Sequence, residues 1–204
     1  MSLTAGGGVN RPLRQCRRTD QPGAHASTGA RRARVPADAA RDPRIDPARV
    51  GFLGSSQAGW IIPAALAAAV PGDARFAVVL SSPATSVGLE SAYSAATGDG
   101  IRPHDALSPE AIDARVDAYA GPQGFDHVPT LRALKTPTLW LVGEDDESIP
   151  VRHTLRNLRA AIGAGAAITL RTYPGANHAL AAAGGPVPYW TDVIDWLRKE
   201  RILQ

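Results

Sequence analysis

The stretch that decides the fold is GFLGSSQAGW, residues 51–60. A short apolar run leads into a turn of small residues and then directly into a helical pattern that continues to about Val70. Such a junction holds the serine at its apex, Ser56, in a strained backbone conformation and pushes its hydroxyl out beyond the sheet. The residues two before and two after it must be small because strand and helix nearly touch, and Gly54 and Ala58 meet this need. Ser56 is therefore a candidate nucleophile.

Further short apolar runs, bounded by Gly, Pro and Ser, have the composition of strands. The predicted strands cover residues 50–53, 76–80, 138–142 and 168–173. Helical spacing follows the elbow and recurs twice near the end of the chain. The apolar faces of those two later helices are Val151, Leu155, Leu158 and Ile162, and Trp190, Val193, Ile194 and Leu197. Strands that alternate with helices predict an α/β fold, a mostly parallel sheet flanked by helices.

Residues 86–125 interrupt this alternation and are too many for a plain loop in a compact domain. Ser108-Pro109-Glu110 predicts a helix start, with a capping serine, a proline in the first helical position and an acidic first turn. Ile112, Val116 and Tyr119 then share one apolar face. We expect a small helical cap insertion at about 86–125, over one end of the sheet.

The charge of the chain is divided unevenly along it. The total is +3, but residues 1–50 hold ten Arg, no Lys and four Asp, a balance of +6 that leaves −3 for the rest. The Arg-rich residues 11–34 have no interleaved aromatic residues, and the folded part that follows is net negative. Both observations argue against a nucleic-acid partner. We expect residues 1–44, which lack regular periodicity, to be poorly ordered or degenerate.

Several other classes of protein are excluded by composition. The apolar run 58–70 is too short to span a bilayer and contains Pro63, and no apolar segment follows the first arginines as in a secretory signal. The single cysteine, Cys16, excludes an internal disulfide and a multi-cysteine zinc site. We therefore expect a cytoplasmic protein with no membrane, metal or cofactor requirement, and with an unknown oligomeric state.

Two later stretches complete a pattern with the elbow. Residues 137–150 read PTLWLVGEDDESIP, and residues 173–178 read YPGANH. Together with residues 51–60 they resemble the α/β-hydrolase superfamily, in particular bacterial serine hydrolases and esterases of the dienelactone-hydrolase and prolyl-oligopeptidase type. The resemblance covers residues 45–204, which we predict to be one α/β-hydrolase-like domain.

The resemblance implies a catalytic triad of Ser56 as nucleophile, His178 as general base and Asp146 as the orienting carboxylate. In the family pattern the acid stands three residues after the Gly and four before the Pro, which favours Asp146 over its neighbour Asp145. The chemistry needs these types, because a serine hydroxyl requires a base and the imidazole requires a carboxylate that fixes its tautomer. All three candidates follow predicted strands, where open α/β sheets place their ligands.

The oxyanion hole and the substrate pocket are defined less fully by the sequence. The backbone N–H of Gln57, at the start of the elbow helix, is the expected oxyanion donor, and Ser55 and Trp60 are candidate pocket residues. The family builds several strands before its elbow, one of which carries a second donor, whereas only 55 residues precede Ser56 here. Residues 20–29, DQPGAHASTG, echo that earlier loop. We expect an N-terminally truncated hydrolase.

The predicted function is a serine hydrolase that cleaves a carboxylic ester, or an amide or thioester, through an acyl-enzyme. The expected partner is a small-molecule ester or amide substrate, without nucleic acid or membrane. One alternative is a catalytically weak or inactive remnant of a truncated hydrolase. The other is a binding module that uses the basic residues 11–34 as an arm.

Overall fold

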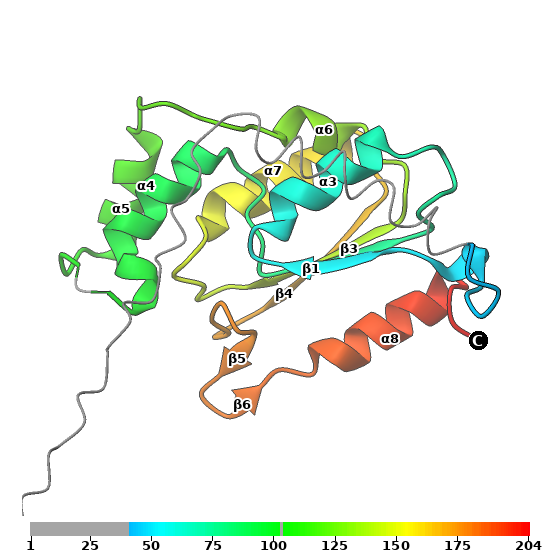
Figure 1. Ribbon diagram of the computed structural model, residues 1–204. Coiled ribbons are helices and arrows are strands. Elements are labelled where there is room, and N and C mark those ends of the chain that lie inside the picture. The colour runs from blue at the N-terminus through cyan, green and yellow to red at the C-terminus, as the bar shows by residue number, and fades with distance from the viewer. Residues whose placement is uncertain (1–40, 103) are drawn as a thin grey trace, which may run out of the picture.

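Four parallel strands form the centre of the molecule in a computed structural model that describes residues 41–102 and 104–204 (Figure 1). The strands are β1 (Phe52–Ser55), β2 (Ala77–Leu80), β3 (Thr138–Gly143) and β4 (Ile168–Tyr173). They lie side by side in the order β1-β2-β3-β4, so each connection returns the chain to the next strand in the same direction. The predicted α/β class is confirmed.

Helices fill the connections and cover both faces of this sheet. They are α3 (Ala58–Ala68), α4 (Val87–Thr97), α5 (Pro109–Asp117), α6 (Val128–Arg132), α7 (Val151–Gly163) and α8 (Tyr189–Lys199). Two 3₁₀ turns, η1 (Pro47–Arg49) and η2 (Gly98–Gly100), and a small antiparallel pair, β5 (Ala181–Ala182) and β6 (Gly185–Pro186), complete the described residues. In Figure 1, α3, α6 and α7 lie on one face of the sheet, α8 on the other, and α4 and α5 beyond the carboxyl ends of the strands.

The two central strands are buried on both faces, which explains their continuous apolar sequences. Val79 and Trp140 belong to the core on the side of α3, α6 and α7, whereas Val78 and Leu141 belong to the core on the side of α8. By contrast, β1 is paired only with β2 among the described residues, and its Leu53 is 55% exposed. The sheet is therefore most deeply buried at β2 and β3, which lie between β1, the strand before Ser56, and β4, the strand before His178.

The buried faces of α7 and α8 are rotated slightly from the predicted ones. In α7 the buried positions include Thr154, Leu158 and Ala161, and Ile162 lies at the rim with 36% of its surface exposed. In α8, Trp196 replaces Trp190, which is 51% exposed and packs on the Tyr189 ring instead. Both misplaced residues stand at an end of the predicted apolar face, where one residue, or about 100° of helix rotation, decides between core and solvent.

Residues 86–125, where the sequence predicts one helix, contain two α-helices, α4 and α5. The start of α5 is as expected, since the Ser108 hydroxyl accepts a hydrogen bond from the Ala111 N–H and Pro109 takes the first helical position. Its Val116 is fully buried. The preceding helix, α4, has its own cap in Ser86, which accepts from the Leu89 N–H. We call residues 86–125 the inserted segment.

Three predictions from the sequence concern residues that lie wholly or mostly outside this description. The poorly ordered segment at 1–44, the basic arm at 11–34 and the echo at 20–29 fall wholly or mostly on residues 1–40, so they stay predictions. Among the helices of residues 41–102 and 104–204, none is long and apolar enough to cross a membrane.

Candidate active site

The elbow at Ser56 has the strained geometry that its sequence predicts. Ser56 has a φ of +55°, a left-handed conformation that residues other than glycine rarely adopt. Its N–H donates to the Leu80 carbonyl, which fixes the elbow to the end of β2. A Cβ at Gly54 would lie 2.7 Å from the Ala58 Cβ, so the close approach of β1 and α3 does require small residues at these positions. The fold thus maintains strain to place one serine at the carboxyl edge of the sheet.

Asp146 lies in the loop after β3 and is 1% exposed. Its Oδ1 accepts hydrogen bonds from the N–H groups of Ser148, at 2.8 Å, and Ile149, at 3.2 Å. The neighbouring Asp145 is exposed, and its N–H donates to the Ala176 carbonyl. The loop therefore orients one carboxylate inward and holds the other in solvent.

His178 follows β4, in a loop whose turn requires a left-handed glycine, Gly175, with a φ of +73°. The Asn177 side chain braces the far side of this loop by accepting from the N–H groups of Ala179 and Ala181. The loop brings the His178 Nδ1 to 2.9 Å and 3.0 Å from the two carboxylate oxygens of Asp146. The predicted base and the predicted acid are thus in direct contact across 32 residues of sequence.

The surroundings of the ring raise the pKa of His178 above its ordinary value. The hydrogen bond to Asp146 is the largest cause, partial burial opposes it, and the negative charges of Asp146, Asp99 and Glu90 add to it. Because Nδ1 is occupied by Asp146, Nε2 is the nitrogen that can take a proton from a nucleophile. No hydrogen bond joins Ser56 and His178 within the described part of the chain, and in enzymes without substrate this contact is often long.

Gln57 carries the backbone N–H that the sequence predicts as an oxyanion donor. It is the N-cap residue of α3, and its backbone N–H donates to no acceptor in residues 41–102 and 104–204. The positive end of the α3 dipole adds to this N–H in stabilising a negative oxygen beside Ser56. The echo at 20–29, where the sequence suggests a second donor, lies outside the described residues.

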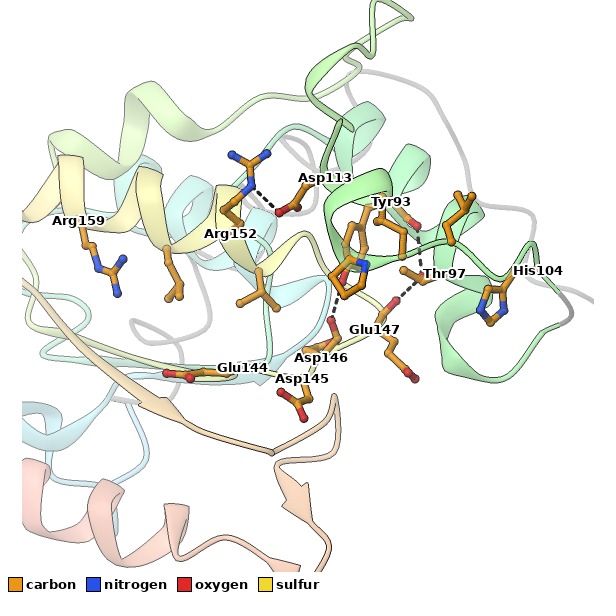
Figure 2. A pocket seen from close by; sticks show the side chains of 15 residues that line it. Tyr93, Thr97, His104, Asp113, Glu144, Asp145, Asp146, Glu147, Arg152 and Arg159 are labelled. Atoms are coloured by element: carbon orange, nitrogen blue, oxygen red, sulfur yellow. Dashed lines mark hydrogen bonds and ion pairs between the residues drawn. The ribbon is translucent and has the colours of Figure 1, made fainter. Parts of the chain in front are cut away.

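An open cavity of about 880 Å³ lies between the inserted segment, α7 and the loop that carries Asp146 (Figure 2). Its walls combine apolar and charged side chains: Tyr93, Thr97, His104, Leu107, Pro109, Ile112, Asp113, Glu144, Asp145, Asp146, Glu147, Val151, Arg152, Leu155 and Arg159. Neither Ser56 nor His178 lines it, so the cavity adjoins the back of the acid loop and not the serine.

The two candidate pocket residues, Ser55 and Trp60, do not line this cavity. Ser55 is exposed on β1, and Trp60 is 3% exposed, with its indole N–H donating to the Thr85 carbonyl at 2.8 Å. Trp60 therefore serves to attach α3 to the loop after β2. Sequence reasoning did not identify Tyr93 or Thr97, which contact the acid loop, because no motif surrounds them.

Another histidine, His153, lies in a packing contact between two helices. His153 is 2% exposed, and its Nε2 lies 2.8 Å from an Asp117 carboxylate oxygen, while Arg152 pairs with both Asp113 and Asp117. These contacts join α5 to the first turn of α7. Within the described residues, no three His, Cys, Asp or Glu side chains are grouped in a way that could hold a metal ion.

The model of one known protein family matches most of this chain. The model of the prolyl oligopeptidase family matches residues 35–201. The chain belongs to this family. It is thus a member of a serine hydrolase family built on the α/β-hydrolase fold. No curated protein sequence matches the chain.

Solved structures of peptidases and esterases share the fold. Dipeptidyl peptidase 4 of Porphyromonas gingivalis superposes with a TM-score of 0.62 at 14% identity, covering 88% of this chain and 23% of its own. An acylaminoacyl peptidase of Pyrococcus horikoshii gives 0.55 at 13% identity, covering 80% of this chain and 26% of its own. Esterase 2 of Thermogutta terrifontis, phosphonylated by cyclosarin, gives 0.53 at 16% identity, covering 89% and 66%. The chain therefore spans about a quarter of the length of the two peptidases.

Proposed function

We propose that this chain hydrolyses a small carboxylic ester by a two-step acyl-enzyme mechanism. The observation that carries the proposal is the contact between His178 and the buried Asp146. These residues follow β4 and β3 as the strained Ser56 follows β1, so all three stand at the carboxyl edge of the parallel sheet. Family membership supports the nucleophilic role of the serine. The same machinery can act on an amide or thioester, whose acyl carbon is attacked in the same way.

In the first step the Ser56 Oγ attacks the ester carbonyl carbon while its proton moves to the His178 Nε2. The carbonyl oxygen becomes negative in the tetrahedral intermediate and accepts a hydrogen bond from the Gln57 N–H, and Asp146 stabilises the imidazolium. The bond from carbon to the alkoxy oxygen then breaks, the leaving alcohol takes the proton from Nε2, and Ser56 remains acylated. A water molecule repeats the sequence, with His178 accepting its proton and returning it to Ser56, and the carboxylic acid is released.

Two features favour an ester over a peptide as the substrate of this chain. An ester has a better leaving group than an amide, so it demands less oxyanion stabilisation, and Gln57 is the one donor identified in the described residues. Removing one donor from such a site costs about 10²–10³ in turnover. If a loss of this size applies, the alternative is a catalytically weak enzyme whose main observable reaction is the acylation of Ser56.

The proposal is tested by a panel of p-nitrophenyl esters of increasing acyl length, assayed with the folded chain and with Ser56→Ala. We expect Ser56→Ala to lower kcat by about 10⁴–10⁶, to the limit of detection. The matched control is Ser55→Ala, which removes the exposed neighbouring hydroxyl and should retain turnover. Ester hydrolysis that survives in Ser56→Ala would overturn the proposal.

A further inference from the structure

Helix α4 of the inserted segment is hydrogen-bonded to the loop that carries the catalytic acid. The Tyr93 hydroxyl donates to the backbone carbonyl of Asp146 at 3.0 Å, and the Thr97 hydroxyl donates to the carbonyl of the next residue, Glu147 (Figure 2). Tyr93 and Thr97 are four residues apart, so their side chains stand one above the other on the same face of the helix. The helix therefore holds two consecutive peptide groups of the acid loop.

These two hydrogen bonds restrain the position of the acid loop relative to the rest of the fold, which the other contacts of Asp146 do not. The N–H groups of Ser148 and Ile149 orient the carboxylate relative to its own loop. Tyr93 and Thr97 instead fix the loop relative to a separate helix. Thr97 is 5% exposed and Tyr93 is half-buried, so water competes poorly for the two carbonyls.

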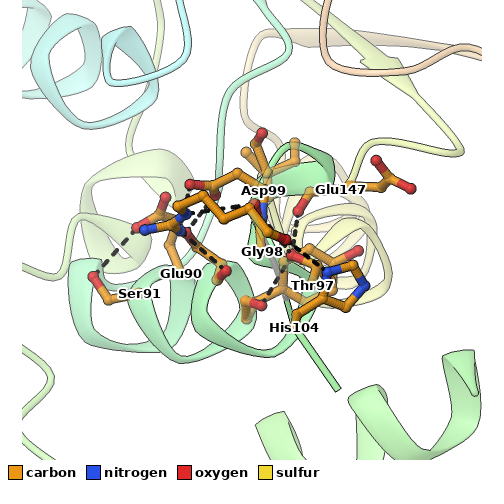
Figure 3. A network of polar contacts seen from close by, with 12 residues as sticks. Glu90, Ser91, Thr97, Gly98, Asp99, His104 and Glu147 are labelled. Atoms are coloured by element: carbon orange, nitrogen blue, oxygen red, sulfur yellow. Dashed lines mark hydrogen bonds and ion pairs between the residues drawn. The ribbon is translucent and has the colours of Figure 1, made fainter. Parts of the chain in front are cut away.

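Helix α4 is itself firmly held, as a support must be. A Cβ at Gly88 would lie 2.1 Å from the Pro122 carbonyl oxygen, so the start of the helix is packed closely against the later part of the inserted segment. Its end is closed by the left-handed Gly98, with a φ of +63°. Beyond that residue, Arg102 binds the Asp99 carboxylate and the Ser94 hydroxyl. Figure 3 shows Asp99 and Thr97 in the polar network at this end of α4.

We propose that Tyr93, assisted by Thr97, is a positioning residue that sets the distance between the catalytic acid and the histidine. The two hydroxyls touch no reacting atom and act through the backbone of Asp146 and Glu147. Without them the loop is free to recede from His178, and the contacts of 2.9 Å and 3.0 Å that orient the imidazole lengthen. The proposal rests on the proposed function for its catalytic consequence, but not for its structural one.

The structural consequence is measured by titrating the His178 ring by NMR, which requires no turnover. The charged groups that act on this ring are Asp146 from the β3–α7 loop and Glu90 and Asp99 from the inserted segment. In Tyr93→Phe these charges are all retained and only the hydroxyl is lost. We expect the pKa of His178 to fall by at least about 0.5, a fraction of the 1–3 that a close opposite charge contributes. Tyr119→Phe is the matched control, because its hydroxyl also donates to a backbone carbonyl of the inserted segment, that of Pro122.

The kinetic consequence separates positioning from substrate binding. We expect Tyr93→Phe to lower kcat about 10- to 100-fold, the scale of a displacement of about 1 Å at a reacting group, with KM little changed. Thr97→Val should lower both kcat and the pKa of His178, whereas Thr97→Ser keeps the donor and should restore both. This pair of variants still tests the positioning role if Tyr93→Phe fails to fold.

Three outcomes are distinguishable. If the parent and Tyr93→Phe differ in the pKa of His178 as expected but the parent hydrolyses no ester, the proposed function is refuted and the positioning role stands. If Tyr93→Phe and Tyr119→Phe have the same kcat and the same His178 pKa, the positioning role is overturned. An equal loss in Thr97→Val and Thr97→Ser overturns the part assigned to Thr97.

Discussion

At the residue scale, two adjacent carboxylates show how the fold separates chemistry from solvation. Asp146 is 1% exposed and contacts His178, whereas Asp145 is exposed and contacts the His178 loop only through its backbone N–H. A carboxylate that holds a histidine must keep one orientation through the catalytic cycle. Within the part of the chain that the structure describes, Asp146 has side-chain hydrogen bonds that impose one orientation and Asp145 has none.

This difference predicts opposite results for two matched substitutions. Asp146→Asn should lower kcat by about 10⁴, because the amide holds the imidazole in the wrong tautomer. Asp145→Asn makes the same chemical change one residue away and should leave turnover close to that of the parent. Steady-state kinetics on one ester decides the matter, and an equal loss in both variants would contradict the assignment.

The pH dependence of activity follows from the raised pKa of His178. The ring must be neutral to accept the Ser56 proton, so kcat/KM rises with pH as the ring deprotonates in the free enzyme. Because the folded pKa lies above the ordinary value of about 6.5, the midpoint of this acidic limb should lie above pH 6.5 as well. A midpoint at or below that value, measured with an ester of pH-independent chemistry, would show that the Asp146 contact is not formed in solution.

The triad candidates could be predicted from the sequence, whereas Tyr93 could not. Ser56, Asp146 and His178 each stand in a local pattern, a strand end followed by residues that fix a particular turn. Tyr93 owes its place to a contact with a residue 53 positions later, and nothing near it in the sequence records that partner. Local chemistry is visible in a sequence, and support through tertiary contacts is not.

At the element scale, the loops after β3 and β4 are joined where Gly143 ends its strand. A Cβ at Gly143 would lie 2.3 Å from the Ala176 carbonyl oxygen and 2.6 Å from that of Asn177. These are backbone atoms of the loop that carries His178, so they cannot turn aside as a side chain can. The distance between acid and base depends on this glycine.

Gly143→Ala should therefore force the His178 loop away from β3. We expect a loss of about 1–3 kcal/mol in the free energy of unfolding, as for overpacked sites, together with a large fall in turnover. The control is Gly163→Ala near the end of α7, where an added Cβ meets nothing within 4 Å and should be neutral or stabilising by up to about 1 kcal/mol. Parent-like stability and activity in Gly143→Ala would contradict the close approach.

The helices show what periodicity can and cannot predict at this scale. The existence of α7 and α8 follows from apolar spacing, but Ile162 and Trp190 lie at the surface because neighbouring residues take the core positions. The helix α4 has a weaker apolar pattern, and its buried positions include Gly88, Glu90 and Ser94. A search for apolar faces does not predict a helix such as α4, whose buried positions are occupied by small and polar residues.

At the scale of the whole molecule, stability is concentrated in the two central strands. The alternation of strands and helices was enough to predict a parallel sheet, because a crossover of that length returns the chain in the same direction. The placement of α4 and α5 at the carboxyl edge was not, since it depends on contacts with α7 and the acid loop. Within the described residues, β1 is paired with β2 alone, and this too is a property of the assembled sheet.

Two leucines on the sheet test this distribution. Leu141 in β3 is fully buried, and Leu141→Ala should lower the free energy of unfolding by about 2–5 kcal/mol. Leu53 in β1 is 55% exposed, and Leu53→Ala should change it by about 0.5 kcal/mol or less. Urea unfolding followed by circular dichroism gives both values. Equal losses would show that the face of β1 that bears Leu53 is covered in solution.

The central claim, that Ser56 is an activated nucleophile, is tested most directly by reaction with a fluorophosphonate followed by peptide mass spectrometry. Attack by the Ser56 Oγ displaces fluoride and leaves one phosphonyl group on the serine. We predict a single adduct on the tryptic peptide of residues 50–75, located to Ser56 by fragmentation, and none in Ser56→Ala. A folded chain that gains no adduct, or gains the same adduct in Ser56→Ala, would contradict the account.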